Sequence, residues 1–491
     1  MLRSTFLVWV FGVAGLGGVQ GATLLEQRIE ELRRTSRAVE AGTLGIEIVQ
    51  LATGKVLYSL NGDHLLTPAS NTKLFSTALA LVRLGPHYRL TTRIYGGRAP
   101  AADGRLSGDL TIVGGGDPSM SYIRIPYDRD AKPADPLEGI EAFADQLAAR
   151  GLRHVAGDIV GDDGAYRAEH FPPGWGVDDP LWEDGAPVSA LCLGDNSIRV
   201  DIYPGAAEGD PATIRFTPAV EYFLSGNRVR TTSTGSHHLE LRRFNGRELE
   251  FSGKVSSAAG RLTEWVAVDD PALYTATALY DSLVRRGISI AGHPVARHRY
   301  HRGPVRSRAD GVVLAQRESP ELAQLLRVTD KVSQNLWAEL MLREVGRVRG
   351  ADGSRKEGLR QMTAFLNEVG IEAKDYVLDD GSGLSRLTLL KPAAIVRLLR
   401  FMKRSDVSDT WLSLMPVGGE DGTLEKRFKK DPAAKSIRAK TGSLSHVNAL
   451  SGYADSATYG EVAFSIIVNH TNAPSSEIRE FIDKIGVILL E

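Results

Sequence analysis

Cysteine is almost absent from this chain of 491 residues, in which Cys192 is the single example. One cysteine excludes an intramolecular disulfide and any metal or iron–sulfur site that needs several cysteines. A basic excess is also missing, because 59 Lys and Arg stand against 60 Asp and Glu and leave a formal charge of −1. Dedicated nucleic-acid binders carry such an excess, so we expect no nucleic-acid partner.

Motifs for nucleotide binding, for the α/β-hydrolase nucleophile and for zinc proteases are missing as well. The sequence has no Gly-x-x-x-x-Gly-Lys-Ser/Thr loop, no Gly-x-Ser-x-Gly elbow and no His-Glu-x-x-His helix. His293, His298 and His301 belong to an Arg-rich region that continues to Arg308. We interpret this region as an exposed connection, with contact to an anionic wall or lipid polymer as the alternative. We expect no metal and no other cofactor.

Long apolar runs are lacking outside the N-terminus. There Phe6–Val13 is continuously apolar, follows Arg3 and leads through a Gly-rich stretch to Gly21. A basic start, a short apolar core and small residues predict a secretory signal peptide over residues 1–21, with an uncleaved N-terminal anchor as the alternative. We therefore expect a periplasmic protein with no stable membrane span in its mature chain. The oligomeric state is left open.

What the chain does contain is typical of a globular protein of several domains, with 42% hydrophobic and 24% charged residues. Apolar patterns predict a hairpin near the N-terminus, two neighbouring strands near the C-terminus and a buried helix over 71–84. In the middle, a βαβ-like order encloses short alternating strands between Asn196 and Val255, which predict a small all-β unit. The predicted hairpin strands are 44–51 with 56–60, and the two neighbouring strands are 446–453 and 461–468.

The best candidate for nucleophilic catalysis is Ser70, because it is the only serine with a lysine three positions later, Lys73. If Ser70 opens the helix that follows Pro68, both side chains lie on one face. A serine hydroxyl needs an adjacent base, and a lysine can serve if its pKa falls from about 10 to roughly 7–8 through burial and a second cation. A single match of this kind is expected by chance, so it carries little weight alone.

Two further motifs follow in order along the chain. Ser333-Gln334-Asn335 lies between apolar residues, although Ser-x-Asn also occurs at Ser59 and Ser225. Lys440-Thr441-Gly442-Ser443 occurs once, just before a predicted strand. A strand with a lysine and two hydroxyls can place a cation and hydrogen-bond donors along an extended peptide, and Gly442 leaves room for close backbone approach.

Together, the three motifs resemble the Ser-x-x-Lys, Ser-x-Asn, Lys-Thr-Gly set of the penicillin-recognising serine acyl-transferases. Four further stretches are similar to signatures of one subgroup, the low-molecular-mass class C penicillin-binding proteins, which are D-alanyl-D-alanine carboxypeptidases and endopeptidases. The resemblance runs from about Gly42 to the C-terminus. The stretches are Gly114–Pro118, Gly185–Leu191, Asp380–Arg386 and Pro416–Leu424.

The resemblance implies a mixed α/β (α+β) fold, with a β-lactamase-like antiparallel sheet flanked by helices. Lys73 and Ser333 lie 260 positions apart, a distance that the family fills with an inserted domain carrying a third domain within it. The expected division is a signal peptide at 1–21, a catalytic domain at 22–88 and 300–491, an inserted α/β domain at 89–193 and 262–299, and a nested all-β domain at 194–261.

The resemblance also implies the chemistry of acylation. Ser70 attacks the carbonyl of the D-Ala–D-Ala bond or of a D-Ala cross-link in peptidoglycan, and Lys73 serves as the general base. Ser333 passes the proton to the leaving amine, and Asn335 hydrogen-bonds Lys73 and the substrate amide. The backbone N–H groups of Ser70 and Ser443 form the oxyanion hole. Penicillins and other β-lactams acylate the same serine.

The same resemblance implies that the substrate binds at the strand that contains Lys440. The peptide pairs with this strand as an added strand. Lys440 supplies the second cation, which lowers the pKa of Lys73. Thr441 and Ser443 hold the terminal carboxylate. An acidic side chain from the inserted domain can bind the amine of diaminopimelate; Asp162, Asp163 and Asp195 are candidates, with loop capping as the alternative for each.

Two departures bear on the activity. Gln334 stands where many class A β-lactamases have Asp, and no acidic loop motif for fast deacylation is found, which favours a peptidase. Thr388 follows the Gly-Ser-Gly stretch where Asn is expected. The alternatives are a peptidoglycan-binding or regulatory relative with weak catalysis, and a β-lactamase. Carboxypeptidase and endopeptidase preference are not separated by the sequence.

Overall fold

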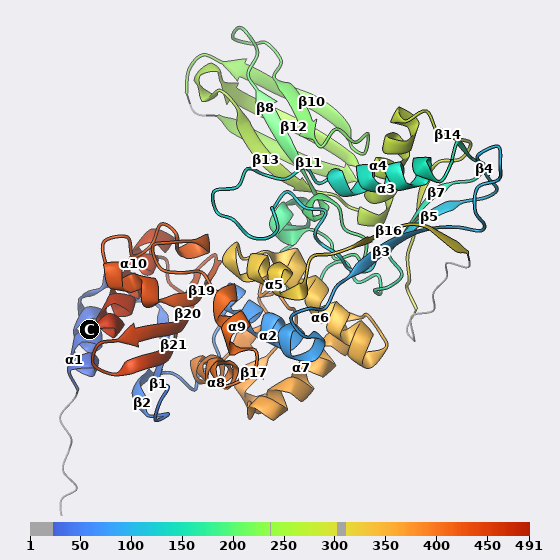
Figure 1. Cartoon of the computed structure of the whole chain (residues 1–491). Helices are drawn as coiled ribbons and strands as arrows, with labels where there is room; N and C mark the ends of the chain where they lie inside the picture. The colour runs from blue at the N-terminus through green and yellow to red at the C-terminus, as the bar shows by residue number, and fades with distance from the viewer. Residues whose placement is uncertain (1–22, 236, 302–310) are drawn as a thin grey trace, which may run out of the picture.

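The structure is a computed structural model that describes residues 23–235, 237–301 and 311–491. Figure 1 shows a sheet with flanking helices at one end of the molecule, a helical middle, and an inserted region at the other end. The predicted signal peptide, 1–21, lies outside the described residues. Within the described ranges, no helix combines the length and the apolar character needed to cross a bilayer.

One five-stranded antiparallel sheet forms the end of the molecule that holds the C-terminus and the first described helix (Figure 1). Its strand order is β19-β20-β21-β1-β2, so β19 is an edge strand. The hairpin predicted near the N-terminus is β1 with β2, and the two strands predicted near the C-terminus are β20 with β21. The strands are β1 (Thr43–Gln50), β2 (Val56–Leu60), β19 (Arg438–Leu444), β20 (Val447–Ser456) and β21 (Gly460–Asn469).

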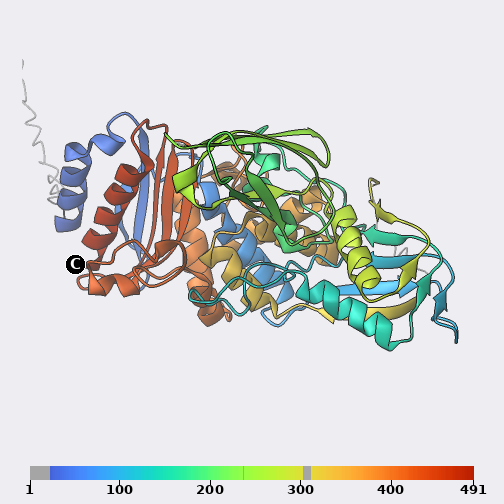
Figure 2. The same cartoon turned by 90° about the horizontal axis from the view of Figure 1, so that it is seen from above.

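Helices cover both faces of this sheet, and Figure 2 shows the layers edge-on. Alternation along β20 explains the two cores: Leu450 and Ala454 pack toward α1 and α10, whereas Ala449 and Tyr453 pack toward the larger helical layer. The helices are α1 (Leu24–Thr35) and α10 (Ser475–Leu490) on one face, and α2 (Lys73–Leu84), α5 (Leu322–Lys331), α6 (Asn335–Gly350), α7 (Arg355–Val369), α8 (Pro392–Lys403) and α9 (Ser408–Leu414) on the other.

Helix α2 lies in the middle of that layer and carries the first motif. Every residue from Lys73 to Leu81 is buried, which agrees with an apolar sequence on all sides. A 3-10 turn, η2 (Ala69–Thr72), leads directly into the helix. The helix ends at Gly85, whose φ of 85° is accessible to glycine at little cost.

The inserted region contains a second five-stranded sheet, of order β15-β7-β5-β3-β16, with both of its helices on one face. A small sheet, β14-β6-β4, lies at its side (Figure 1). The elements are β3 (Thr91–Gly96), β4 (Arg105–Leu106), β5 (Leu110–Val113), α3 (Glu138–Ala149), β6 (His154–Val155), β7 (Ile159–Asp162), α4 (Pro271–Arg285), β14 (Ser289–Ile290), β15 (Pro294–Arg297) and β16 (Val312–Glu318).

Two three-stranded sheets, β13-β8-β9 and β10-β12-β11, enclose a small separate core in the nested region. A turn at Asn245-Gly246 joins β11 to β12, which pair as antiparallel strands. The strands are β8 (Ser197–Tyr203), β9 (Thr213–Thr217), β10 (Leu224–Thr232), β11 (His238–Asn245), β12 (Glu248–Ser256) and β13 (Leu262–Ala267); a two-stranded ribbon, β17 (Tyr376–Val377) with β18 (Leu389–Leu390), lies in the helical layer.

Two of the predicted domain bounds separate strands that pair. β13 pairs with β8, so the sheet of the nested unit continues past residue 261. β16 pairs with β3, so residues 312–318 belong to the inserted sheet and not to the catalytic segment expected from residue 300. Local composition does not show such long-range pairing. We propose bounds after Ala267 and after Glu318, and the rest of the division stays a prediction.

Candidate active site

Ser70 lies on the 3-10 turn η2, one residue after Ala69, whose φ of 48° is left-handed. The expected position at the start of an α-helix is therefore displaced by one turn, and α2 begins at Lys73. A 3-10 turn has three residues per turn, so residues three apart eclipse one another. This geometry brings Lys73 Nζ to 2.9 Å from Ser70 Oγ. Ser70 is half-buried and faces a cavity, whereas Lys73 is fully buried.

Three groups surround the Lys73 amine. Besides Ser70 Oγ, it contacts Asn335 Oδ1 at 2.5 Å and the carbonyl oxygen of Ser382 at 2.8 Å. Both of these oxygens can only accept hydrogen bonds. A neutral amine has two N–H bonds and one lone pair, so donation to Asn335 and Ser382 leaves the lone pair for the Ser70 hydroxyl. The geometry suits a lysine that accepts the proton of Ser70.

The pKa of Lys73 is lowered to about 8, and burial is the largest cause. The buried carboxylates of Asp380 and Glu339 act against burial and raise it. Lys440, predicted to lower this pKa as a second cation, is not among the main causes of the shift. Instead, the pKa of Lys440 itself is lowered well below its ordinary value, first by burial and then by repulsion from Lys73. Desolvation of the amine explains the lowered pKa of Lys73.

Ser333 and Lys440 form the second polar contact of the site. Lys440 Nζ donates to Ser333 Oγ at 2.8 Å and to the carbonyl oxygen of Thr441 at 2.9 Å. Ser333 has a φ of 65°, a left-handed conformation that costs a non-glycine residue free energy. It precedes α6, which begins at Asn335. The structure thus brings all three motifs to one place, as the sequence predicted.

The edge strand β19 forms one wall of the site. Thr441 Oγ1 donates to Thr423 Oγ1 at 2.8 Å, and Ser443 Oγ donates to Asn448 Oδ1 at 3.0 Å. A Cβ at Gly442 would lie 2.6 Å from the carbonyl oxygen of Pro68, so this glycine permits the close approach of β19 to the turn that carries Ser70. A bond from Asn71 Nδ2 to the carbonyl oxygen of Lys440, 3.1 Å long, holds the two segments together.

The Asp-Gly-Ser-Gly stretch is a turn that positions Lys73. Glu339 Oε1 accepts hydrogen bonds from the backbone N–H groups of Gly381 and Ser382, at 2.7 and 2.8 Å. Asp380 accepts bonds from four groups of the same loop, and the hydroxyl of Thr388 is one of them, at 3.0 Å. Thr388, which departs from the expected Asn, therefore caps the loop whose Ser382 carbonyl contacts Lys73.

Several residues of the site were not found from the sequence. Asp330 is fully buried three positions before Ser333, and burial raises its pKa to about 7 against the attraction of Lys440 and Lys73. The sequence signal that could have indicated Asp330 as a site residue is its charge among the apolar residues of α5. Thr423, the partner of Thr441, lies in one of the signature stretches. A carbonyl contact such as that of Ser382 has no sequence signal.

The candidates for an acidic amine contact lie away from the cavity that contains Ser70. Asp162 pairs with Arg297, Asp163 with His298, and Asp195 bonds Ser121 and Trp337. Among the described residues that line the cavity, which measures about 350 Å³, the acid is Asp184. Its backbone carbonyl also accepts a bond from Asn335 Nδ2 at 2.9 Å.

His298 is the histidine of the Arg-rich region that lies between carboxylates. Its ring contacts Asp163 at 3.0 Å and Asp270 at 3.3 Å. These bonds raise its pKa to about 10, so the ring is an imidazolium at neutral pH. Asp163, His170 and His298 are close enough to share a metal ion, and the hydrogen bonds of His298 to the two carboxylates also hold the group together. Arg302, Arg306 and Arg308 lie outside the described residues.

A profile of the D-Ala-D-Ala carboxypeptidase 3 (S13) family matches residues 25–487. The chain belongs to this family. A D-alanyl-D-alanine carboxypeptidase from an Actinomadura species is 32% identical over 474 residues, which cover 94% of this chain and 84% of that protein. A penicillin-sensitive carboxypeptidase A from Dictyostelium discoideum is 25% identical over 458 residues, which cover 88% of this chain and 83% of that protein.

The fold of this S13 family member is also found in a solved structure. Penicillin binding protein 4 from Haemophilus influenzae superposes with a TM-score of 0.81 at 21% identity, over 94% of this chain and 99% of that one. The family and the penicillin-binding-protein fold predicted from the motifs are therefore confirmed. The roles of the individual site residues stay predictions that the geometry supports.

Proposed function

We propose that this chain is a serine D,D-peptidase that hydrolyses the D-Ala–D-Ala bond, D-Ala cross-links, or both, in peptidoglycan through an acyl-enzyme on Ser70. The observation that carries the proposal is the contact between Ser70 Oγ and the buried Lys73 amine, whose other two partners are acceptors. Membership of the S13 family supports the substrate class. A predicted signal peptide and a cell-wall substrate support a periplasmic location.

Acylation begins when neutral Lys73 takes the proton of Ser70 as Oγ attacks the carbonyl carbon. The oxygen of the tetrahedral intermediate accepts hydrogen bonds from the backbone N–H groups of Ser70 and Ser443, a contribution of about 10²–10³ in rate per donor. The C–N bond then breaks, and the proton that Lys73 took from Ser70 passes through Ser333 to the leaving amine; Ser333 Oγ lies 2.8 Å from Lys440 Nζ. Water hydrolyses the resulting ester and restores Ser70.

Substrate binding follows from the position of β19 at the edge of its sheet. The first residues of this edge pair with residues 416–418, so an extended peptide can pair with the part of β19 that follows Ala439, as in other cases of strand addition. Thr441, Ser443, Arg427 and Arg479 line the cavity, and hydroxyls and cations of this kind suit a terminal carboxylate, although Asp483 already pairs with Arg427. β-Lactams, which present a carbonyl and a carboxylate in a similar arrangement, are the second class of ligand.

The test is covalent labelling with a fluorescent penicillin. We expect the wild-type chain to carry a stable label and Ser70→Ala to carry none, with both folded by circular dichroism. Equal labelling of the two would overturn the proposal, and an unlabelled wild type would favour a binding or regulatory relative. Repeated turnover of penicillin without a persistent label would indicate a β-lactamase.

A second measurement decides between the two peptidase activities. Cross-linked and uncross-linked muropeptides are digested separately, and the products are identified by mass spectrometry. Release of D-Ala from pentapeptides indicates a carboxypeptidase, and conversion of dimers to monomers indicates an endopeptidase. Both reactions proceed through the same acyl-enzyme, so Ser70→Ala should abolish each of them.

A further inference from the structure

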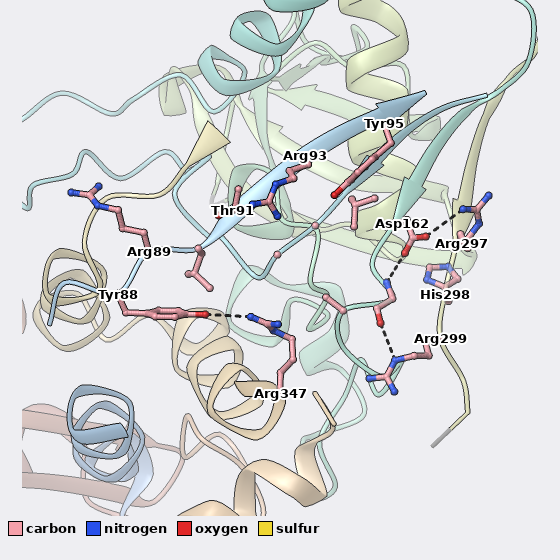
Figure 3. A pocket seen from close by; sticks show the side chains of 16 residues that line it. Tyr88, Arg89, Thr91, Arg93, Tyr95, Asp162, Arg297, His298, Arg299 and Arg347 are labelled. Carbon is pink, nitrogen blue, oxygen red and sulfur yellow. Dashed lines mark hydrogen bonds and ion pairs between the residues drawn. The ribbon is translucent and has the colours of Figure 1, made fainter. Parts of the chain in front are cut away.

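A second cavity, of about 380 Å³, lies where the inserted sheet meets helix α6, and Figure 3 shows its lining. It has no lining residue in common with the cavity that contains Ser70. Pockets of a few hundred Å³ are the usual size for small-molecule sites. The lining is rich in arginine, and the described residues that carry charge or a hydroxyl there are Tyr88, Arg89, Thr91, Arg93, Tyr95, Asp162, Arg297, His298, Arg299 and Arg347.

One wall of this cavity is the face of the inserted sheet opposite the face that packs against α3 and α4. Side chains alternate along a strand, so β3 turns Thr92 and Ile94 toward the core with α3 and α4. Thr91, Arg93 and Tyr95 consequently share the opposite face and line the cavity. In Figure 3 the guanidinium of Arg93 and the hydroxyl of Tyr95 both reach into it.

The facing wall is helix α6, where Arg347 is held in a fixed position. The buried carboxylate of Glu344 accepts bonds from Arg347 Nε at 2.7 Å and Nη2 at 2.6 Å. The hydroxyls of Tyr88 and Tyr166 bond the same carboxylate. Arg347 Nη2 also donates to Tyr88 at 3.2 Å, which Figure 3 shows. A guanidinium held in this way loses little conformational entropy when a ligand binds to it.

The third side of the cavity comes from β15 and the residues that follow it. Arg299 Nε donates to the carbonyl oxygen of Gly164 at 2.8 Å, and Arg297 lies 3.4 Å from Asp162. His298 adds an imidazolium. Guanidinium groups from three separate elements therefore converge on one space (Figure 3).

The charges are not all compensated from within the protein. Acidic partners lie beside five of the six cations, including Asp352 for Arg299 and Glu321 for Arg89, and these partners orient the guanidiniums. Arg93 is the exception: among the residues that the structure describes, its guanidinium has no acidic partner and no hydrogen bond. It is nevertheless half-buried. A half-buried cation without a partner is stabilised by an anion from outside.

We propose that this cavity is a binding site for a phosphate-bearing ligand. Arginine forks match the oxygens of a phosphate in pairs, and a tetrahedral dianion offers acceptors in the several directions from which Arg93, Arg299 and Arg347 approach. A planar carboxylate offers hydrogen-bond acceptors in fewer directions. The hydroxyls of Thr91 and Tyr95 supply further donors. The ligand is larger than inorganic phosphate, because the cavity leaves space beside the arginines.

The site is separate from peptide cleavage. Helix α6 carries Asn335 at its first residue and Arg347 twelve positions later, a distance of about 18 Å along a helix axis. The phosphate ligand therefore does not compete with a substrate at Ser70. A phosphorylated small molecule and a segment of a phosphodiester polymer share the recognised chemistry.

The experiment is calorimetric titration and thermal melting of the full chain with inorganic phosphate, glycerol 3-phosphate, poly(glycerol phosphate) and citrate, at matched ionic strength. We expect the phosphate compounds to raise the melting temperature and citrate to have a smaller effect. Arg93→Gln should weaken phosphate binding by about tenfold or more, since a hydrogen bond to a charged group is lost. Tighter binding of the polymer than of glycerol 3-phosphate identifies the polymer as the source; the reverse identifies a small molecule.

The control variant is Arg105→Gln, which removes the same charge from an exposed position of the inserted region outside the cavity. It should bind phosphate as the wild type does. The proposal is wrong if no phosphate compound binds, if Arg93→Gln and Arg105→Gln bind alike, or if citrate binds more tightly than phosphate. Binding needs no acylation, so failure of penicillin labelling leaves this test unaffected.

Discussion

Ser70 Oγ lies 2.9 Å from Lys73 Nζ, while Asn335 Oδ1 and the Ser382 carbonyl occupy the other two directions of the same amine. The two acceptors make the neutral form of Lys73 the reactive one, because only that form has a lone pair for the Ser70 proton. Burial lowers the pKa of Lys73 to about 8, which brings this form within reach at physiological pH.

The rate of acylation should rise with pH to a midpoint near 8 and level off above it. Below the midpoint, the neutral fraction of Lys73 falls about tenfold per pH unit. The second-order rate constant for penicillin acylation, measured from pH 5.5 to 9.5, tests this because it reports the free enzyme. Lys73→Ala should lose roughly 10²–10⁴ in this constant and remain folded. A flat profile, or near-normal acylation by the variant, contradicts the assignment of the base.

Asp330→Asn should move the same midpoint to lower pH. The Asp330 carboxylate raises the pKa of both Lys73 and Lys440, and with its own pKa of about 7 it is mostly ionised at pH 8. Removing its charge therefore favours the neutral amines. Thr77→Val is the matched control, because it removes the 3.1 Å hydrogen bond to Asp330 and leaves the charge. An unmoved midpoint, or one that rises, would show that Asp330 does not act on the lysines.

Much of the site could be predicted from the sequence because its signals are local. Ser70 and Lys73 are three positions apart, and Lys440, Thr441 and Gly442 are adjacent on one strand. Residues three apart share a face in a helical turn, and consecutive residues of one strand lie along the same stretch of a sheet edge. The three motifs in this order resemble those of one family. From that resemblance, Ser333 and Asn335 could be predicted to lie in the same site as Ser70 and Lys73.

The rest could not be predicted because it depends on contacts between distant segments. The carbonyl oxygen of Ser382 contacts Lys73, which lies 309 positions earlier in the chain. Every residue has such an oxygen, so the sequence does not indicate which one forms the contact. The pKa of Lys73 depends on burial, which a charge pattern does not show. The pairing of β16 with β3 and of β13 with β8 is equally long-range. Two of the predicted domain bounds separate these paired strands.

Thr441→Val should weaken substrates that have a free terminal carboxylate more than substrates in which it is amidated. The variant keeps the shape of the side chain but removes the hydroxyl that lines the cavity and bonds Thr423. A lost hydrogen bond to a charged group corresponds to about tenfold or more in kcat/KM. The comparison uses a D-Ala–D-Ala peptide and its C-terminal amide. Equal losses for the two peptides would remove Thr441 from carboxylate recognition.

Gly442→Ala should slow acylation by about 10²-fold without unfolding the protein. The added Cβ would lie 2.6 Å from the Pro68 carbonyl oxygen, so β19 must move away from the turn that carries Ser70. Displacements near 1 Å at a reacting group cost about this much in rate. Gly226→Ala is the control, because a Cβ there meets no atom closer than 3.9 Å. Wild-type labelling of Gly442→Ala would show that the close approach is dispensable.

Asp184→Asn should raise KM for peptides that carry a free amine on their diamino acid and leave kcat nearly unchanged. Asp184 is the acid that lines the active-site cavity among the described residues, and its carboxylate can pair with an ammonium group. The substitution preserves the backbone carbonyl that accepts a bond from Asn335 Nδ2, but it removes a charge that raises the pKa of Lys73. The kcat values are therefore compared at pH 9.5, where Lys73 is neutral in both proteins. The measurement compares a diaminopimelate peptide with its side-chain N-acetylated form. The variant and the wild type should have the same KM for the acetylated peptide, because this peptide has no ammonium group that could pair with Asp184. If both peptides lose affinity equally, Asp184 shapes the cavity and does not recognise the amine.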